Sequence, residues 1–222
     1  ASTNSISQQE MCAQTFAVYQ KVLDSNTLEQ MDDNTRQLLA EVIKAGIMGD
    51  PRWVGWTMDD EGGMTESIDW RRMMLYAEHE NIRNYVDYGI NILGLHAPAI
   101  DTVGTPAYFP ENYSRPCPVR QIVGEYMGDE TDYLLRIIRQ ILKKPTMLHL
   151  IELTRELYRD TVDDNALNQA LEEKRLLKQA MRLMPVLKEL TLLDEGYMPL
   201  EPIDDRATRQ IRKQIATHLK IE

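Results

Sequence analysis

The sequence has little cysteine and no long apolar run. Its only cysteines are Cys12 and Cys117, and two cysteines so far apart exclude a disulfide framework and a cysteine-rich zinc site. We interpret both as reduced thiols, which are typical of a cytoplasmic protein. No apolar run approaches the roughly 20 residues that a membrane-spanning helix needs. The polar first ten residues also lack the basic and apolar blocks of a signal peptide, so we expect a cytoplasmic protein that does not enter membranes.

Positive charge is also in short supply. The chain of 222 residues has 25 Lys and Arg against 35 Asp and Glu, which gives a formal net charge of -10 and a pI near 5.0. Proteins that coat DNA non-specifically depend on a cationic surface, and this balance argues against that class. It does not argue against a narrow basic groove within an otherwise acidic assembly.

Hydrophobic periodicity predicts helices and no convincing pair of strands. We therefore expect an all-α fold: a two-lobed helical core at 11–193, an N-terminal arm at 1–10, and a C-terminal arm at 194–222 that contains a short helix. A helix that begins after Asp32 and Asp33 is expected to stop near Gly46. Pro145 and Pro185 are expected to interrupt or kink their helices. Further helices are predicted at 10–23, 67–95, 118–144, 148–158, 164–184 and 207–219.

Two irregular segments separate these helices. Residues 49–63 combine glycines with Trp53 and Trp56, and we expect the two indole rings to fix this loop on the core. Residues 96–118 contain five prolines, so no regular element is expected there. A loop of that length is typical of a contact or binding role.

The sequence offers little for catalysis. Glu78, His79 and Glu80 are adjacent, but consecutive helical side chains point about 100° apart and cannot converge on one ion. None of the four histidines follows a glutamate by three residues, as a di-iron bundle requires. Nucleophile triads and glycine-rich phosphate loops are also absent. We therefore expect neither an enzyme nor a bound cofactor or metal.

The stretch from Pro118 to Lys144 reverses the overall charge locally. Pro118 suits the first turn of a helix, where free N–H groups attract anions, and Arg120 adds a planar fork that matches a phosphate. Arg136, Arg139, Lys143 and Lys144 then follow with no acid between 134 and 144. One interpretation is a phosphate site. The alternative is a core helix with a solvated basic face that ends in lysines suited to the helix dipole.

Several short pieces, taken in order, resemble the coat proteins of flexible filamentous plant viruses, of the potyvirus type. The resemblance touches both ends and the middle of the chain, but two parts depart from the family pattern. Residues Thr65 to Pro106 intervene where the family is much shorter, and the serine of the family's RNA pocket falls near Met48 or Gly49 and is lost. The similar pieces are Phe16–Tyr19, Val42–Gly46, Pro51–Asp60, Val119–Val123 with Tyr126, Leu157–Thr161, the helix to Ala180, and Leu192–Gly196.

The resemblance implies a helical capsid located in the virion and the host cytoplasm. Copies would polymerise through their terminal arms and package single-stranded RNA through its phosphates, without sequence readout. Arg120 matches the arginine of the family's RNA pocket, and the aspartate falls near Glu156 if a gap is allowed. The candidate RNA-binding residues are Arg115, Arg120, Gln121, Arg136, Arg139 and Glu156. The alternative is a bacterial cytosolic helical adaptor, such as a secretion chaperone or gatekeeper, and an unrecognised helical enzyme ranks third.

Overall fold

The structure, a computed structural model, describes residues 7, 10–16, 28–54, 68–98, 129–159 and 163–217. Over these residues the chain forms nine labelled α-helices and three short 3-10 helices, with no strand. The all-α prediction is therefore confirmed. The part of the 118–144 prediction before residue 129, and the indole of Trp56, lie outside the described residues.

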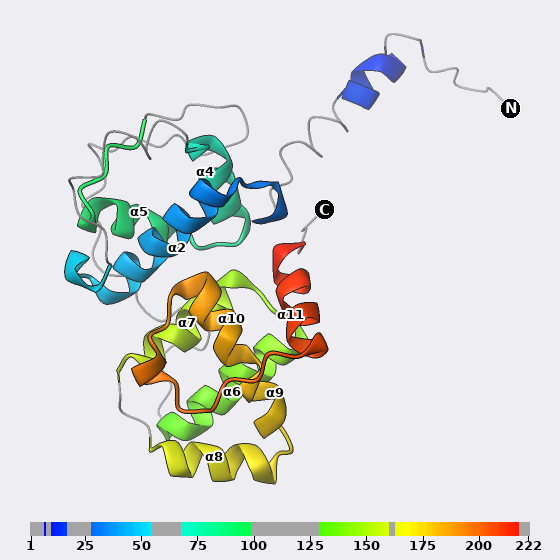
Figure 1. Ribbon diagram of the computed structural model, residues 1–222. Coiled ribbons are helices and arrows are strands. Elements are labelled where there is room, and N and C mark those ends of the chain that lie inside the picture. The colour runs from blue at the N-terminus through cyan, green and yellow to red at the C-terminus, as the bar shows by residue number, and fades with distance from the viewer. Residues whose placement is uncertain are drawn as a thin grey trace, which may run out of the picture.

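Figure 1 shows the helices in two groups. The first contains α2, α4 and α5, and the second contains α6 to α11. Helix α2 joins the groups, because it packs against α5 in its own group and against α7 and α10 in the other. The elements are η1 (Leu28–Gln30), α2 (Asp33–Met48), η2 (Pro51–Trp53), α4 (Trp70–His79), α5 (Arg83–Ile92), α6 (Glu130–Lys143), α7 (Met147–Leu157), α8 (Asp164–Glu173), α9 (Leu177–Met181), α10 (Leu183–Thr191), η6 (Glu195–Tyr197) and α11 (Arg206–Ala216).

Helices α2 and α5 approach each other through two glycines. A Cβ added to Gly46 would lie 2.3 Å from the carbonyl oxygen of Tyr85, and one added to Gly89 would lie 1.9 Å from that of Val42. The prediction that Gly46 ends its helix is therefore wrong: this glycine is buried within α2 and allows the backbones to touch. The helix ends at Gly49 instead, which has a φ of 68° and returns its N–H to the Ala45 carbonyl.

Two helices predicted as continuous are divided. The 67–95 segment breaks at Asn81, whose φ of 59° ends α4 before α5 begins. Next to the break, the buried Glu80 carboxylate accepts a hydrogen bond from the N–H of Met147, at 3.1 Å. The 164–184 segment breaks at Arg175, with a φ of 57°, and again at Arg182. Hydrophobic spacing alone did not reveal these breaks, because the apolar side chains keep facing the core through each turn.

Other helix ends agree with the sequence. Asp163 caps α8 by accepting the N–H of Asn165 at 2.8 Å. The segment around Pro145 separates α6 from α7, and Pro185 lies in the first turn of α10, where proline is tolerated. Helix α11 packs against α10 and buries Ile215 to 2% exposure, so the described part of 194–217 is folded onto the core.

A buried polar layer connects α5 with α7. The Tyr85 hydroxyl donates to the Glu152 carboxylate at 2.7 Å and accepts from the Arg155 guanidinium at 3.2 Å. Burial, reinforced by the nearby Glu152 charge, raises the pKa of Tyr85 well above its ordinary value, so the hydroxyl keeps its proton and remains a donor. A hydrogen-bonded carboxylate in this position fixes how the two groups of helices meet.

Candidate functional site

Three of the predicted RNA-binding residues, Arg115, Arg120 and Gln121, lie outside the described residues. The others lie on two helices of the second group. Arg136 and Arg139 are exposed on α6. Glu156 on α7 is only 2% exposed, and its carboxylate forms an ion pair with Arg159 at 3.2 Å. The two arginines are therefore exposed neighbours on α6, whereas Glu156 is buried on α7.

Helix α6 is sharply divided between an apolar and a basic side. Its apolar side is inserted between α7 and α8, and Arg136, Arg139 and Lys143 recur on the opposite side at spacings of three and four residues. Side chains at these spacings are neighbours on one helical face. We call these three residues the α6 basic face. The buried residues are Tyr133, Leu134, Leu135, Ile137, Ile138 and Ile141.

Within the described ranges, Arg139, Lys143 and Lys144 form no ion pair with an acidic side chain. This differs from most other arginines there, which are neutralised by nearby carboxylates. The paired arginines include Arg36 with Asp33, Arg52 with Asp50, Arg72 with Asp69, Arg83 with Asp87, Arg159 with Glu156, Arg182 with Asp205, and Arg212 with Asp204 and Glu189. In this acidic chain, the end of α6 therefore keeps positive charge for an external anion.

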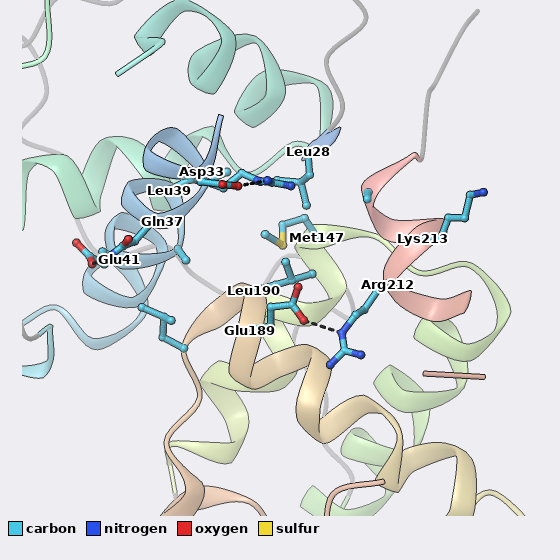
Figure 2. A pocket seen from close by; sticks show the side chains of 14 residues that line it. Leu28, Asp33, Gln37, Leu39, Glu41, Met147, Glu189, Leu190, Arg212 and Lys213 are labelled. Carbon is cyan, nitrogen blue, oxygen red and sulfur yellow. Dashed lines mark hydrogen bonds and ion pairs between the residues drawn. The ribbon is translucent and has the colours of Figure 1, made fainter. Parts of the chain in front are cut away.

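A groove of about 670 Å³ lies between helix α2 of the first group and helices α10 and α11 of the second (Figure 2). Its apolar lining comes from η1, α2, α7, α10 and α11, and charged side chains surround it. Most of these charged side chains form ion pairs with one another, because Asp33 pairs with Arg36 and Glu189 pairs with Arg212. The apolar lining consists of Leu28, Leu39, Ala40, Met147, Leu190, Leu192 and Ala216.

The helical segment at 10–16 stands apart from both groups of helices (Figure 1). Its start is well formed, because the Ser7 N–H donates to the Glu10 carboxylate at 2.8 Å while the Glu10 N–H donates to the Ser7 hydroxyl at 3.2 Å. Yet Met11 is 57% exposed and Phe16 is 70% exposed. This short helix therefore presents apolar side chains that nothing in the described part of the chain covers, as expected for a helix that docks on another surface.

The Trp53 ring does hold its loop on the core, as the sequence predicted. It makes edge contacts with Tyr158 and Tyr197, with ring centroids 5.8 and 6.0 Å away. Tyr158 is itself fixed, since its hydroxyl donates to the Leu192 carbonyl at 3.1 Å and accepts the Asp194 N–H at 3.0 Å. The rings touch one another, which leaves no space for a ligand between them.

Sequence reasoning missed the groove and the pairing of the arginines. Both depend on residues that are distant in the chain, and no local signal identifies them. The described residues contain no group of three His, Cys, Asp or Glu side chains arranged to hold a metal ion. None of the helices in the same ranges is long and apolar enough to cross a membrane. Comparisons with known protein families, curated proteins and solved structures returned no match.

Proposed function

We propose that the chain is a coat protein that polymerises into a flexible helical filament and packages single-stranded RNA through its phosphates. The observation that carries the proposal is the positive charge left at the end of α6. Arg139 and Lys143 are exposed and form no ion pair within the described ranges, although acids outnumber bases in the chain. Cations spaced along one helical face contact successive phosphates and carry no sequence information, as a general packaging protein requires.

The proposed assembly joins neighbouring copies through the N-terminal part of the chain that contains the 10–16 helix. The 10–16 helix of one copy would insert Met11 and Phe16 into the apolar groove of the next. Burying a phenylalanine fully contributes about 1.5–3 kcal/mol, and repetition along a filament multiplies this small contribution.

The test begins with protein purified from its source. Its absorbance ratio at 260 and 280 nm reports bound nucleic acid, and negative-stain microscopy reports its assembly state. We expect nucleic acid together with long flexuous rods. Monomers or dimers free of nucleic acid would refute the coat-protein proposal and favour the helical adaptor.

A pair of matched variants tests the α6 basic face directly. Arg139→Gln/Lys143→Gln removes two charges but keeps the long side chains and helix propensity. Lys174→Gln/Lys178→Gln removes the same charge from two exposed positions, one at the end of α8 and one within α9. We expect the first variant to lose RNA and the second to retain it. If both retain RNA equally, the α6 basic face is not the binding surface.

A further inference from the structure

We propose that α11 carries a second phosphate-binding surface for single-stranded RNA, formed by Arg206, Arg209 and Lys213. We call these residues the α11 basic face. The inference rests on the proposed function for the identity of the polyanion. It adds a binding surface more than sixty residues beyond α6 in the sequence.

The first observation is a repeated pattern. Residues 136–143 read RIIRQILK and residues 206–213 read RATRQIRK, so both helices contain Arg-x-x-Arg-Gln-Ile-x-Lys. Ile141 is buried and Ile211 packs against the core, so the isoleucine at the equivalent position of the pattern fixes each helix on the core. The positions corresponding to the α6 basic face then point outward, and Arg206, Arg209 and Lys213 are all exposed.

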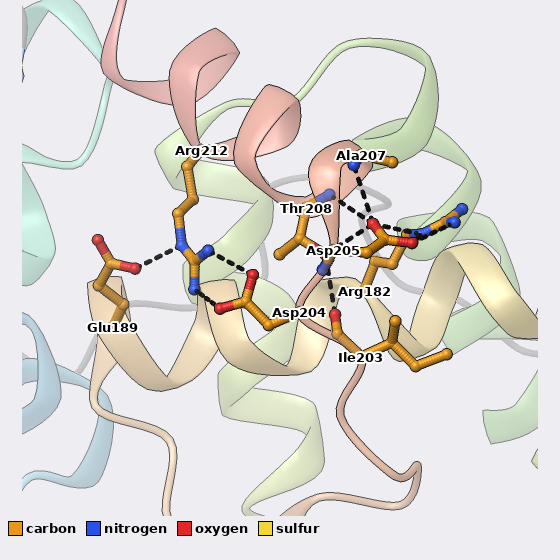
Figure 3. Close-up of polar contacts among 8 residues, drawn as sticks. All are labelled: Arg182, Glu189, Ile203, Asp204, Asp205, Ala207, Thr208 and Arg212. Carbon is orange, nitrogen blue, oxygen red and sulfur yellow. Dashed lines mark hydrogen bonds and ion pairs between the residues drawn. The ribbon is translucent and has the colours of Figure 1, made fainter.

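The second observation is that the acidic side chains around α11 already form ion pairs with arginines outside the α11 basic face (Figure 3). Arg212 binds Asp204 at 2.9 and 3.0 Å and Glu189 at 2.6 Å, while Arg182 binds Asp205 at 2.6 Å. The hydrogen bond from Arg182 is the main reason that the pKa of Asp205 falls to about 2, so this pair persists at neutral pH.

The α11 basic face itself forms no ion pair within the ranges that the structure describes. Arg209 lies close enough to Asp204 to help lower its pKa, but not within ion-pair distance. Arg206 also occupies the first position of the helix, where a cation is unfavourable to the helix dipole. Helix stability therefore gives no reason for this charge, whereas an external anion does.

The third observation is position. Lys213 extends away from the interior of the groove, whereas Arg212 turns toward Glu189 (Figure 2). Met147 lies three residues after Lys144 and lines the same groove as Lys213. The start of α7, which follows α6 in the chain after Lys144, and helix α11 therefore both line this groove, and in the proposal one RNA strand passing beside it contacts both basic faces.

The experiment measures binding of fluorescein-labelled oligouridine to the full chain by anisotropy over a range of salt concentrations. The α11 variant is Arg209→Gln/Lys213→Gln, which matches Arg139→Gln/Lys143→Gln in charge and spacing. Lys174→Gln/Lys178→Gln is the control. Two lost phosphate contacts should reduce the steepness of the plot of log affinity against log salt concentration by about 1.4. If the variant and the wild type bind equally at 1 M salt, this corresponds to roughly 25-fold weaker binding by the variant at 0.1 M salt.

The outcomes are distinguishable. If the α11 variant binds like the control while the α6 variant is weakened, the α11 proposal is wrong and the proposed function stands. If the wild-type chain does not bind the oligonucleotide, both fail. A parallel titration with phosphatidylserine vesicles identifies the polyanion: loss of vesicle binding with unchanged RNA binding would overturn the assignment to RNA. Far-UV circular dichroism checks that each variant is folded.

Discussion

Gly89→Ala tests the close packing of α2 against α5. A Cβ at position 89 would lie 1.9 Å from the carbonyl oxygen of Val42 and 2.8 Å from its carbonyl carbon. These are backbone atoms within a helix, so rotating a side chain cannot relieve the contact. The helices would have to separate, which would loosen the fully buried Val42, Ile43 and Val86.

The expected change in stability combines two opposing effects. Overpacking a core costs about 1–3 kcal/mol, and a backbone clash places Gly89→Ala at the upper end of that range. Alanine gains back about 1 kcal/mol in helix propensity over glycine. We therefore expect the free energy of unfolding to fall by about 2 kcal/mol, which lowers the Tm by about 4–8 °C for a chain of this size.

Chemical denaturation followed by far-UV circular dichroism measures this change. Gly196→Ala is the matched control, because a Cβ at position 196 would meet no atom within 4 Å. Its free energy of unfolding should change by no more than about 0.5 kcal/mol. A Gly89→Ala protein as stable as the wild type, or more stable, would refute the close contact, because helix propensity would then be acting alone.

Three further predictions concern assembly, pH and RNA. Phe16→Asp should abolish filaments in sedimentation while changing the free energy of unfolding by less than about 0.5 kcal/mol, because the ring is already exposed; filaments of normal length would argue against docking. The pKa of Asp205 is about 2 because Arg182 stabilises its charged form, so its contribution to stability is present above about pH 4 and is lost as pH falls toward 2. Asp205→Asn should therefore reduce the change of the denaturation midpoint with pH over that range, and a variant with the same pH profile as the wild type would contradict this. Arg120→Ala should lower the 260/280 ratio of purified protein without changing its circular dichroism, and normal RNA content would exclude Arg120 as a phosphate ligand.

The sequence predicted the helical class well because each helix buries one face of a single core. In α6 the apolar positions recur with helical spacing, and the structure buries those side chains. Helix starts were also predictable where an aspartate caps its own helix, as Asp163 does. Both signals are local, so they survive without knowledge of the neighbouring helices.

The breaks and close contacts could not be predicted in the same way. Gly46 resembles a helix stop in the sequence, but its role is decided by the Tyr85 backbone that touches it. Asn81 and Arg175 have positive φ values at the points where one helix ends and the next begins. Such features depend on tertiary contacts, which hydrophobic periodicity does not encode.

The candidate site shows the same division. The sequence identified the basic run on α6, because four cations without an acid are visible in any reading of residues 134–144. It could not identify which cations elsewhere are neutralised, since the partners are far apart: Lys44 binds Asp194 across 150 positions, and Arg182 binds Asp205 across 23. The repeated Arg-x-x-Arg-Gln-Ile-x-Lys pattern is visible in the sequence, but only the structure shows that the α11 basic face, like Arg139 and Lys143, forms no ion pair within the described residues.

The net charge of -10 therefore does not oppose binding of a polyanion. In the described part of the chain, many cations are held by acids of the same chain and contribute little to the field outside it. The cations without such a partner on α6 and α11 act locally, because charges more than about 8–10 Å away are screened at physiological salt. Acidic surfaces elsewhere would then keep unassembled copies soluble, and RNA would bring the basic faces of neighbouring copies onto one strand. This reasoning requires binding to weaken steeply as salt rises, so an RNA affinity independent of salt would contradict it.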